Sequence, residues 1–175
     1  MRRDQLEHII RAAAAVADDP DIVVFGSQAI LASVPDAPAA MLRSMEADVW
    51  PRNHPERWEL IDGALGEGSL FHETFGYYAQ GIEERTAVLP SGWQQRLVLV
   101  CNENTRFTCG WALEAHDLIV SKLIAGREKD VDYAEAAVAA GLVQVGELAL
   151  RLATTTLDAE VRALALRRID SLRNA

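Results

Sequence analysis

One short apolar run, which ends in glycine and serine, decides how the first half of the sequence is interpreted: Ile22-Val23-Val24-Phe25-Gly26-Ser27-Gln28. Consecutive β-branched residues between turn-forming residues are typical of a short buried strand. Glycine permits close approach of a backbone to a ligand, and serine commonly begins a helix. The run therefore predicts a strand, a Gly26-Ser27 turn and a short helix over 28–33. This turn is either a plain connection or a phosphate-binding site at a helix N-terminus.

A second strand-like stretch carries two acidic residues that alternate with apolar ones: Met45-Glu46-Ala47-Asp48-Val49-Trp50. Because side chains alternate between the two faces of a strand, Glu46 and Asp48 are expected on the same face. Carboxylate oxygens suit a hard cation such as Mg²⁺, which would offset the cost of burying two negative charges. The alternative is an exposed edge strand, on which acidic residues deter aggregation.

The two lysines of the chain, Lys122 and Lys129, lie in one short window, whereas all other basic residues are arginine. Lys122 lies in an otherwise apolar helical segment, and Arg127 and Asp130 follow at the start of the next predicted helix. A lysine is a compact charge that can neutralise a triphosphate, with Asp130 acting as a base or orienting the lysine. The alternative is a solvated helical hairpin with surface ion pairs, which add little to stability.

The remaining pattern predicts an α+β fold, in which a small mixed β-sheet core with helices precedes a helical C-terminal portion. We expect the core over residues 1–112 and the helical portion, packed on it, over 113–175. Apolar spacing predicts the further helices over 3–18, 55–65, 69–75, 114–125, 127–140, 144–154 and 158–173. Alternation and β-forming residues predict the further strands over 77–80, 86–89 and 96–101.

Composition narrows the class of protein. A chain of 175 residues with 50% hydrophobic residues is typical of a globular protein with a substantial core. No apolar run approaches the roughly 18 residues of a spanning helix, and the N-terminus has no signal-peptide core, so we expect a cytoplasmic protein without a membrane partner. The net charge of −9 argues against extended binding of duplex nucleic acid. Cys101 and Cys109 form neither a metal motif nor a disulfide framework, so we expect reduced thiols.

The order of these features, together with two further stretches, resembles a known superfamily. The stretches are Leu89-Pro90-Ser91-Gly92-Trp93 with Arg96-Leu97, and His116-Asp117-Leu118 running through Ser121-Lys122-Leu123 to Ala125-Gly126-Arg127-Glu128-Lys129-Asp130. They resemble the nucleotidyltransferase fold of polymerase-beta type. Over about residues 20–140 the chain is more closely similar to a bacterial family of uncharacterised nucleotidyltransferase-like proteins. It is distantly similar to AbiEii-type toxins of toxin–antitoxin systems.

This resemblance implies a nucleotide site. Four residues would contact the nucleotide: Gly26, Ser27, Lys122 and Arg127. The resemblance further implies that Glu46 and Asp48 bind Mg²⁺, and that Asp48, Lys122 and Asp130 are catalytic. The acidic pattern departs from the usual Asp-x-Asp, because Glu46 is one methylene longer. A third sheet carboxylate, common in the superfamily, has only candidates without motif support: Glu83, Glu84 and Glu103.

The implied activity is transfer of a nucleoside monophosphate from an NTP to an acceptor, with Mg²⁺ as cofactor. Toxin relatives imply tRNA or a protein as the acceptor and a cognate antitoxin as a partner. The departures in the acidic pattern leave a second hypothesis open. In that hypothesis the chain is a non-catalytic module that retains the fold and binds a nucleotide or a partner protein.

Overall fold

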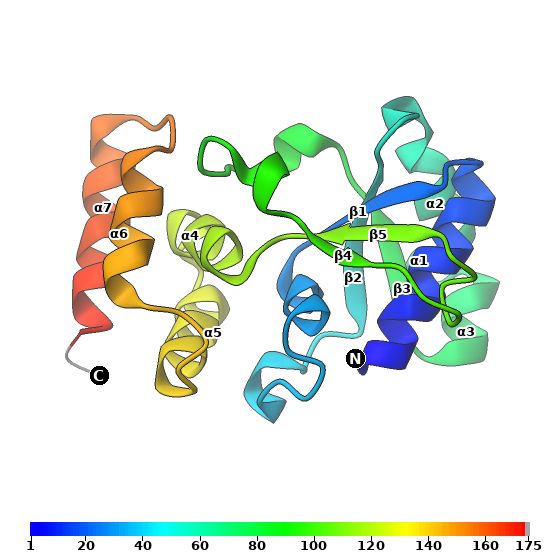
Figure 1. Ribbon diagram of the computed structural model, residues 1–175, viewed down its shortest axis with the longest axis horizontal. Coiled ribbons are helices and arrows are strands. Elements are labelled where there is room, and N and C mark those ends of the chain that lie inside the picture. Colours follow the sequence, from blue (N-terminus) through cyan, green and yellow to red (C-terminus); the bar gives the residue numbers. More distant parts are fainter. Residues whose placement is uncertain (174–175) are drawn as a thin grey trace. The chain divides into compact units, whose positions relative to one another are not determined.

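A computed structural model describes residues 1–173 and contains a five-stranded mixed sheet together with helices (Figure 1). The predicted α+β class is therefore confirmed. The chain divides into two compact units, each described by itself below. The sheet unit comprises Met1–Thr86 and Leu97–Leu113, and the helical unit comprises Ala87–Arg96 and Glu114–Ala175. The predicted boundary after residue 112 lies beside the boundary after Leu113, and residues 87–96 group with the helices.

The sheet has the strand order β3-β2-β1-β5-β4. Its strands are β1 (Asp21–Phe25), β2 (Glu46–Pro51), β3 (Tyr78–Gly81), β4 (Val98–Val100) and β5 (Cys109–Ala112). The central strand β1 pairs antiparallel with β2 and parallel with β5, while β3 runs parallel to β2 and β4 antiparallel to β5.

One predicted strand is wrong and one strand was missed. Within the predicted strand 86–89, Thr86 ends a 3₁₀ helix and the residues after it form no strand. β5 was missed because Cys109-Gly110-Trp111-Ala112 contains glycine and has no clear apolar alternation. Pairing with β1 on one side and β4 on the other holds this segment extended.

Helices α1 (Arg3–Ala17), α2 (Trp58–Leu65) and α3 (Leu70–Phe75) lie together in the sheet unit (Figure 1). A Cβ at Gly110 of β5 would lie 2.5 Å from Ile10 Cδ1 of α1, so α1 packs directly on this face of the sheet. Strand register places Val24 and Val49 on the same face as Gly110, and both valines are fully buried. The residues that alternate with Val49 on β2, including Asp48, therefore lie on the opposite face.

The helical unit contains α4 (Ala115–Ala125), α5 (Glu128–Ala139), α6 (Val145–Ala153) and α7 (Ala159–Ser171), close to the four helices predicted there. α4 is the central helix, because it packs against each of the other three. Across residues 1–173, none of the helices is long and apolar enough to cross a membrane. Short 3₁₀ helices complete the described elements: η1 (Ser27–Ala32), η2 (Ala39–Met41), η3 (Pro55–Arg57), η4 (Glu84–Thr86) and η5 (Trp93–Arg96).

A buried ion-pair cluster joins residues 87–96 to α4. Arg96 donates two hydrogen bonds to the fully buried Asp117 carboxylate, at 2.8 and 3.0 Å, and a third to the carbonyl of Ser91. Arg151 of α6 also contacts Asp117, at 3.2 Å. Burial raises the pKa of Asp117 to about 6, although the Arg96 guanidinium opposes this shift. The helical unit is therefore held together by residues from the stretches that carry the family resemblance, namely Ser91, Arg96 and Asp117.

Candidate functional site

The Gly26-Ser27 turn and the acidic strand meet at the end of β1. Phe25, the last residue of β1, pairs with Asp48 of β2. Gly26 follows with a left-handed φ of +63°, and a Cβ at this position would collide with Asp48 Oδ2 and lie 3.0 Å from its Cγ. Glycine is therefore required at position 26 for two reasons: the backbone conformation disfavours any side chain, and the Asp48 carboxylate fills the space where a Cβ would lie. Two stretches that are separate in sequence are therefore in contact.

Glu46 lies on the same face of β2 and has a partner that the sequence did not indicate. β2 and β3 pair in parallel, so that Tyr78 stands opposite Glu46. The Tyr78 hydroxyl donates a hydrogen bond to Glu46 Oε2 at 3.2 Å. Burial, and then the nearby Glu46 charge, raise the pKa of Tyr78 to about 12. Tyr78 is therefore a neutral hydrogen-bond donor that orients Glu46, and only the pairing of β3 with β2 brings it there.

The three candidates for a third sheet carboxylate do not lie beside Asp48. The residue opposite Asp48 on β3 is Gln80, which is exposed. Because β3 runs parallel to β2, Glu83 and Glu84 follow at the end of the sheet where β2 finishes, away from Gly26. Glu103 follows β4, whose last residue pairs near the start of β5. Glu103 therefore lies toward the same end of the sheet as Glu83 and Glu84, away from Gly26. Within residues 1–173, no group of three or more acidic, histidine or cysteine side chains could hold a metal ion.

The predicted helix after Gly26 is a six-residue 3₁₀ helix, η1, and its N-cap is Gly26 rather than Ser27. A 3₁₀ helix this short has a smaller dipole than a full α-helix would have at this point. The next residue, Gln28, is fully buried, and both polar atoms of its amide lack a hydrogen-bond partner within residues 1–173. Buried amides of this kind are rare in native proteins and occur at functional sites or beside ordered water.

In the helical unit, Lys122, Arg127 and Asp130 form one cluster. The Asp130 carboxylate is fully buried and accepts hydrogen bonds from Lys122 Nζ at 3.0 Å and from Arg127 Nε at 2.6 Å. These two cations hold the pKa of Asp130 below its usual value, although burial opposes them. Lys122 also lies 4.5 Å from the centre of the Tyr133 ring. This arrangement favours an orienting role for Asp130 over the role of a base.

Comparison with known protein families shows to which family the chain belongs. The family described as "Nucleotidyltransferase of unknown function (DUF6036)" matches residues 4–171. The chain belongs to this nucleotidyltransferase family. No curated protein and no solved structure matches the chain. The predicted similarity to a nucleotidyltransferase-like family is thus confirmed, while the similarity to AbiEii-type toxins stays a prediction.

The acidic pair of this nucleotidyltransferase fits a magnesium ion that is shared with a substrate. Glu46 and Asp48 lie on one face of β2, and Gly26 leaves the space that the Asp48 carboxylate occupies. Proteins commonly bind Mg²⁺ through one or two carboxylates together with substrate phosphates and water. Two carboxylates supply too few ligands for an ion caged by protein alone. A nucleotide would therefore have to supply the remaining oxygen ligands.

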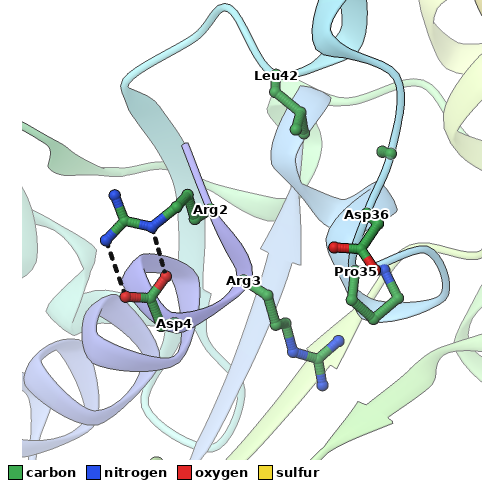
Figure 2. A pocket seen from close by; sticks show the side chains of 7 residues that line it. Arg2, Arg3, Asp4, Pro35, Asp36 and Leu42 are labelled. Atoms are coloured by element: carbon green, nitrogen blue, oxygen red, sulfur yellow. Dashed lines mark hydrogen bonds and ion pairs between the residues drawn. The ribbon is translucent and has the colours of Figure 1, made fainter.

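A groove of about 400 Å³ lies elsewhere in the sheet unit of this nucleotidyltransferase, beside the start of α1 (Figure 2). Figure 2 shows the Arg2 guanidinium turned toward the Asp4 carboxylate, with which it forms an ion pair at 3.0 Å. Arg3 donates to the carbonyls of Leu31 and Ala32 at the end of η1. Both guanidinium groups are thus engaged within the protein. No predicted site residue lines this groove.

Proposed function

We propose that the protein transfers a nucleoside monophosphate from an NTP to an acceptor hydroxyl, with Mg²⁺ held by Glu46, Asp48 and the phosphates. One observation carries this proposal: the Asp48 carboxylate packs against Gly26 at the end of β1, with Glu46 on the same strand face. The two carboxylates and the glycine turn are the parts that such a reaction needs. The family match over residues 4–171 supports the same class of reaction.

In this reaction the acceptor oxygen attacks the α-phosphorus, the bond to the β-phosphate breaks, and pyrophosphate leaves. The chain contributes positioning and charge rather than a covalent intermediate. Gly26 and Ser27 would offer backbone close to the phosphates, and Asp48 and Glu46 would hold the Mg²⁺ ion. Bound Mg²⁺ supplies neutralisation of the charge on the phosphates.

The proposal is tested by Mg²⁺-dependent transfer of label from each NTP to tRNA, to protein and to the chain itself. Asp48→Asn removes one metal ligand and retains the shape of the side chain, so we expect loss of transfer. Asp62→Asn is the matched control, because Asp62 is an exposed carboxylate of α2 in the same unit. Absence of transfer by the unaltered protein, or equal transfer by both variants, would refute the proposal.

Phosphate contacts by Lys122 and Arg127, with Asp130 orienting Lys122, are proposed from the family resemblance. The two lysines provide a matched comparison. Lys122 has a side chain that is 10% exposed and paired with Asp130, whereas Lys129 is exposed. We expect Lys122→Met to weaken NTP binding and Lys129→Met to leave it unchanged. Equal affinities for the two variants would exclude Lys122 from the nucleotide site.

The acceptor is proposed to be RNA, with tRNA as the first candidate, or a protein. A toxin function with a cognate antitoxin rests on the distant resemblance. It is tested by the growth of cells that express the chain with and without neighbouring genes. Growth arrest that depends on Asp48 supports a toxin. Arrest that persists in Asp48→Asn separates toxicity from nucleotidyl transfer.

A second candidate function is nucleotide binding without turnover. It is favoured by the residue opposite Asp48 on β3, which is Gln80 and not a third carboxylate. Calorimetry distinguishes the two candidates. A catalytic site built on two carboxylates requires Mg²⁺ for tight NTP binding, whereas a binding module that retains affinity in chelator would support the second candidate.

A further inference from the structure

The two cysteines, which are eight residues apart in sequence, face each other across two strands of the sheet unit. Their Sγ atoms lie 3.4 Å apart, with the Cys109 thiol donating toward the Cys101 sulfur. The register pairs Val100 with Gly110, so the next pair along β4 and β5 is Cys101 with Cys109. Both residues are partly exposed and are free thiols.

Cys101 and Cys109 form the type of antiparallel pair in which the two side chains lie closest together. The N–H of Cys109 donates to the carbonyl of Pro20, beside β1, so the polar backbone groups of Cys109 point away from β4. Cys101 and Cys109 are therefore a non-hydrogen-bonded antiparallel pair, the type in which Cα atoms lie about 4.5 Å apart. That separation lies within the range of about 4.4–6.8 Å that a disulfide spans. A bond can form here with little movement of the strands.

The loop between the cysteines is held by hydrogen bonds within itself and to α1. Asn102 accepts hydrogen bonds from the backbone N–H groups of Asn104 and Thr105, and the Thr105 hydroxyl donates to the Asn102 carbonyl. The side chains of Asn102 and Asn104 both donate to the Glu7 carboxylate of α1. Such a loop keeps the two thiols at high effective concentration relative to each other.

We propose that Cys101 and Cys109 form a reversible intramolecular disulfide when the chain meets a small disulfide oxidant such as oxidised glutathione. The Cys101 thiolate attacks one glutathione sulfur, the glutathione disulfide breaks, and one glutathione thiolate leaves. Cys109 then loses its proton and displaces the second glutathione from Cys101. Two protein thiols and one glutathione disulfide thus become one protein disulfide and two glutathione thiols.

The environment of the pair sets the order of these steps. Burial, and then its hydrogen bond to Cys101, raise the pKa of the Cys109 thiol to about 11. Cys109 is therefore protonated and donates its S–H toward Cys101, while the Cys101 thiol donates to the Phe107 carbonyl at 3.3 Å. The thiolate is the nucleophile in thiol–disulfide exchange, and the raised pKa of Cys109 makes it a slow first attacker, so Cys101 reacts first.

The test uses the full chain, reduced and then equilibrated in a series of glutathione redox buffers. Free thiols are blocked with N-ethylmaleimide, and intact mass then counts the blocked groups. We expect conversion from two blocked thiols to none, with loss of two hydrogens and full reversal by dithiothreitol. Cys109→Ser should instead accumulate the mixed disulfide of Cys101 with glutathione. Cys101→Ser should react more slowly than Cys109→Ser.

The urea-unfolded chain is the control. It shows whether the folded structure, and not only the short separation of the two cysteines in sequence, favours the disulfide. A native disulfide that closes so short a loop should form with an equilibrium constant on the order of 50-fold larger in the folded chain. A ratio of one or less would overturn the proposal. It would also be overturned if the folded chain accumulated only the mixed glutathione disulfide, or if both thiols stayed reduced in buffers that oxidise the unfolded chain.

Discussion

The contact between Gly26 and Asp48 makes Gly26→Ala the most informative substitution. Alanine at φ +63° and ψ −170° enters a backbone region that essentially only glycine occupies, at a cost of about 1–3 kcal/mol. The new Cβ also collides with Asp48 Oδ2, and relieving such overpacking typically costs a further ~1–3 kcal/mol. We therefore expect Gly26→Ala to lower the free energy of unfolding by about 2–6 kcal/mol.

Gly76→Ala is the matched control in the same unit. Gly76 has a left-handed φ of +74°, and a Cβ there would meet nothing within 4 Å. This substitution should therefore cost only the αL conformational part, about 1–2 kcal/mol. The difference between the two variants contains the collision with Asp48 and the extra backbone cost at Gly26, whose ψ is −170° where that of Gly76 is +11°; the double-mutant cycle separates the two.

A double-mutant cycle completes the test. Asp48→Ala removes the atoms with which the new Cβ collides, so the double variant should recover the collision energy. We expect a coupling of about 1–3 kcal/mol between the two positions. Urea unfolding followed by tryptophan fluorescence gives the four stabilities. Equal losses for Gly26→Ala and Gly76→Ala, with additivity within about 0.5 kcal/mol in the cycle, would refute the packing of Asp48 against Gly26.

Three further predictions concern buried polar groups. Arg96→Met leaves the Asp117 carboxylate buried beside one remaining arginine, and should cost about 3–5 kcal/mol at pH 8. The pKa of Asp117 in the folded chain is raised to about 6, so Asp117 takes up a proton and becomes neutral as the pH falls. The stability lost in Arg96→Met should therefore be smaller at pH 5 than at pH 8. An equal loss of stability at both pH values would contradict this. Tyr78→Phe removes the hydrogen bond to Glu46 and should cost about 1 kcal/mol in urea unfolding while lowering Mg²⁺-dependent transfer, and normal transfer would exclude an orienting role. Gln28→Met replaces an amide without partners by an apolar side chain of similar length, so stability should rise by about 1–3 kcal/mol, and a fall would show that the amide is satisfied in solution.

The sequence predicted most helices, because their apolar residues recur at a local spacing that needs no knowledge of neighbours. It also placed Glu46 and Asp48 on one face of a strand, since alternation is a property of the strand itself. The Gly26-Ser27 turn was predicted at the end of β1 for the same local reason. The strand expected over 86–89 failed because β-forming residues make a strand only where a partner strand pairs with them.

Which side chains meet was decided by the tertiary structure alone. The contact of Asp48 with Gly26 depends on the antiparallel register of β1 and β2, and the bond from Tyr78 to Glu46 depends on the parallel register of β2 and β3. The pairing of β4 with β5 likewise sets Cys101 against Cys109. Strand pairing joins residues that are distant in the chain, and a shift by one residue would send each side chain to the other face. Local residue patterns predict the elements, whereas their registry, which builds the site, is a property of the folded sheet.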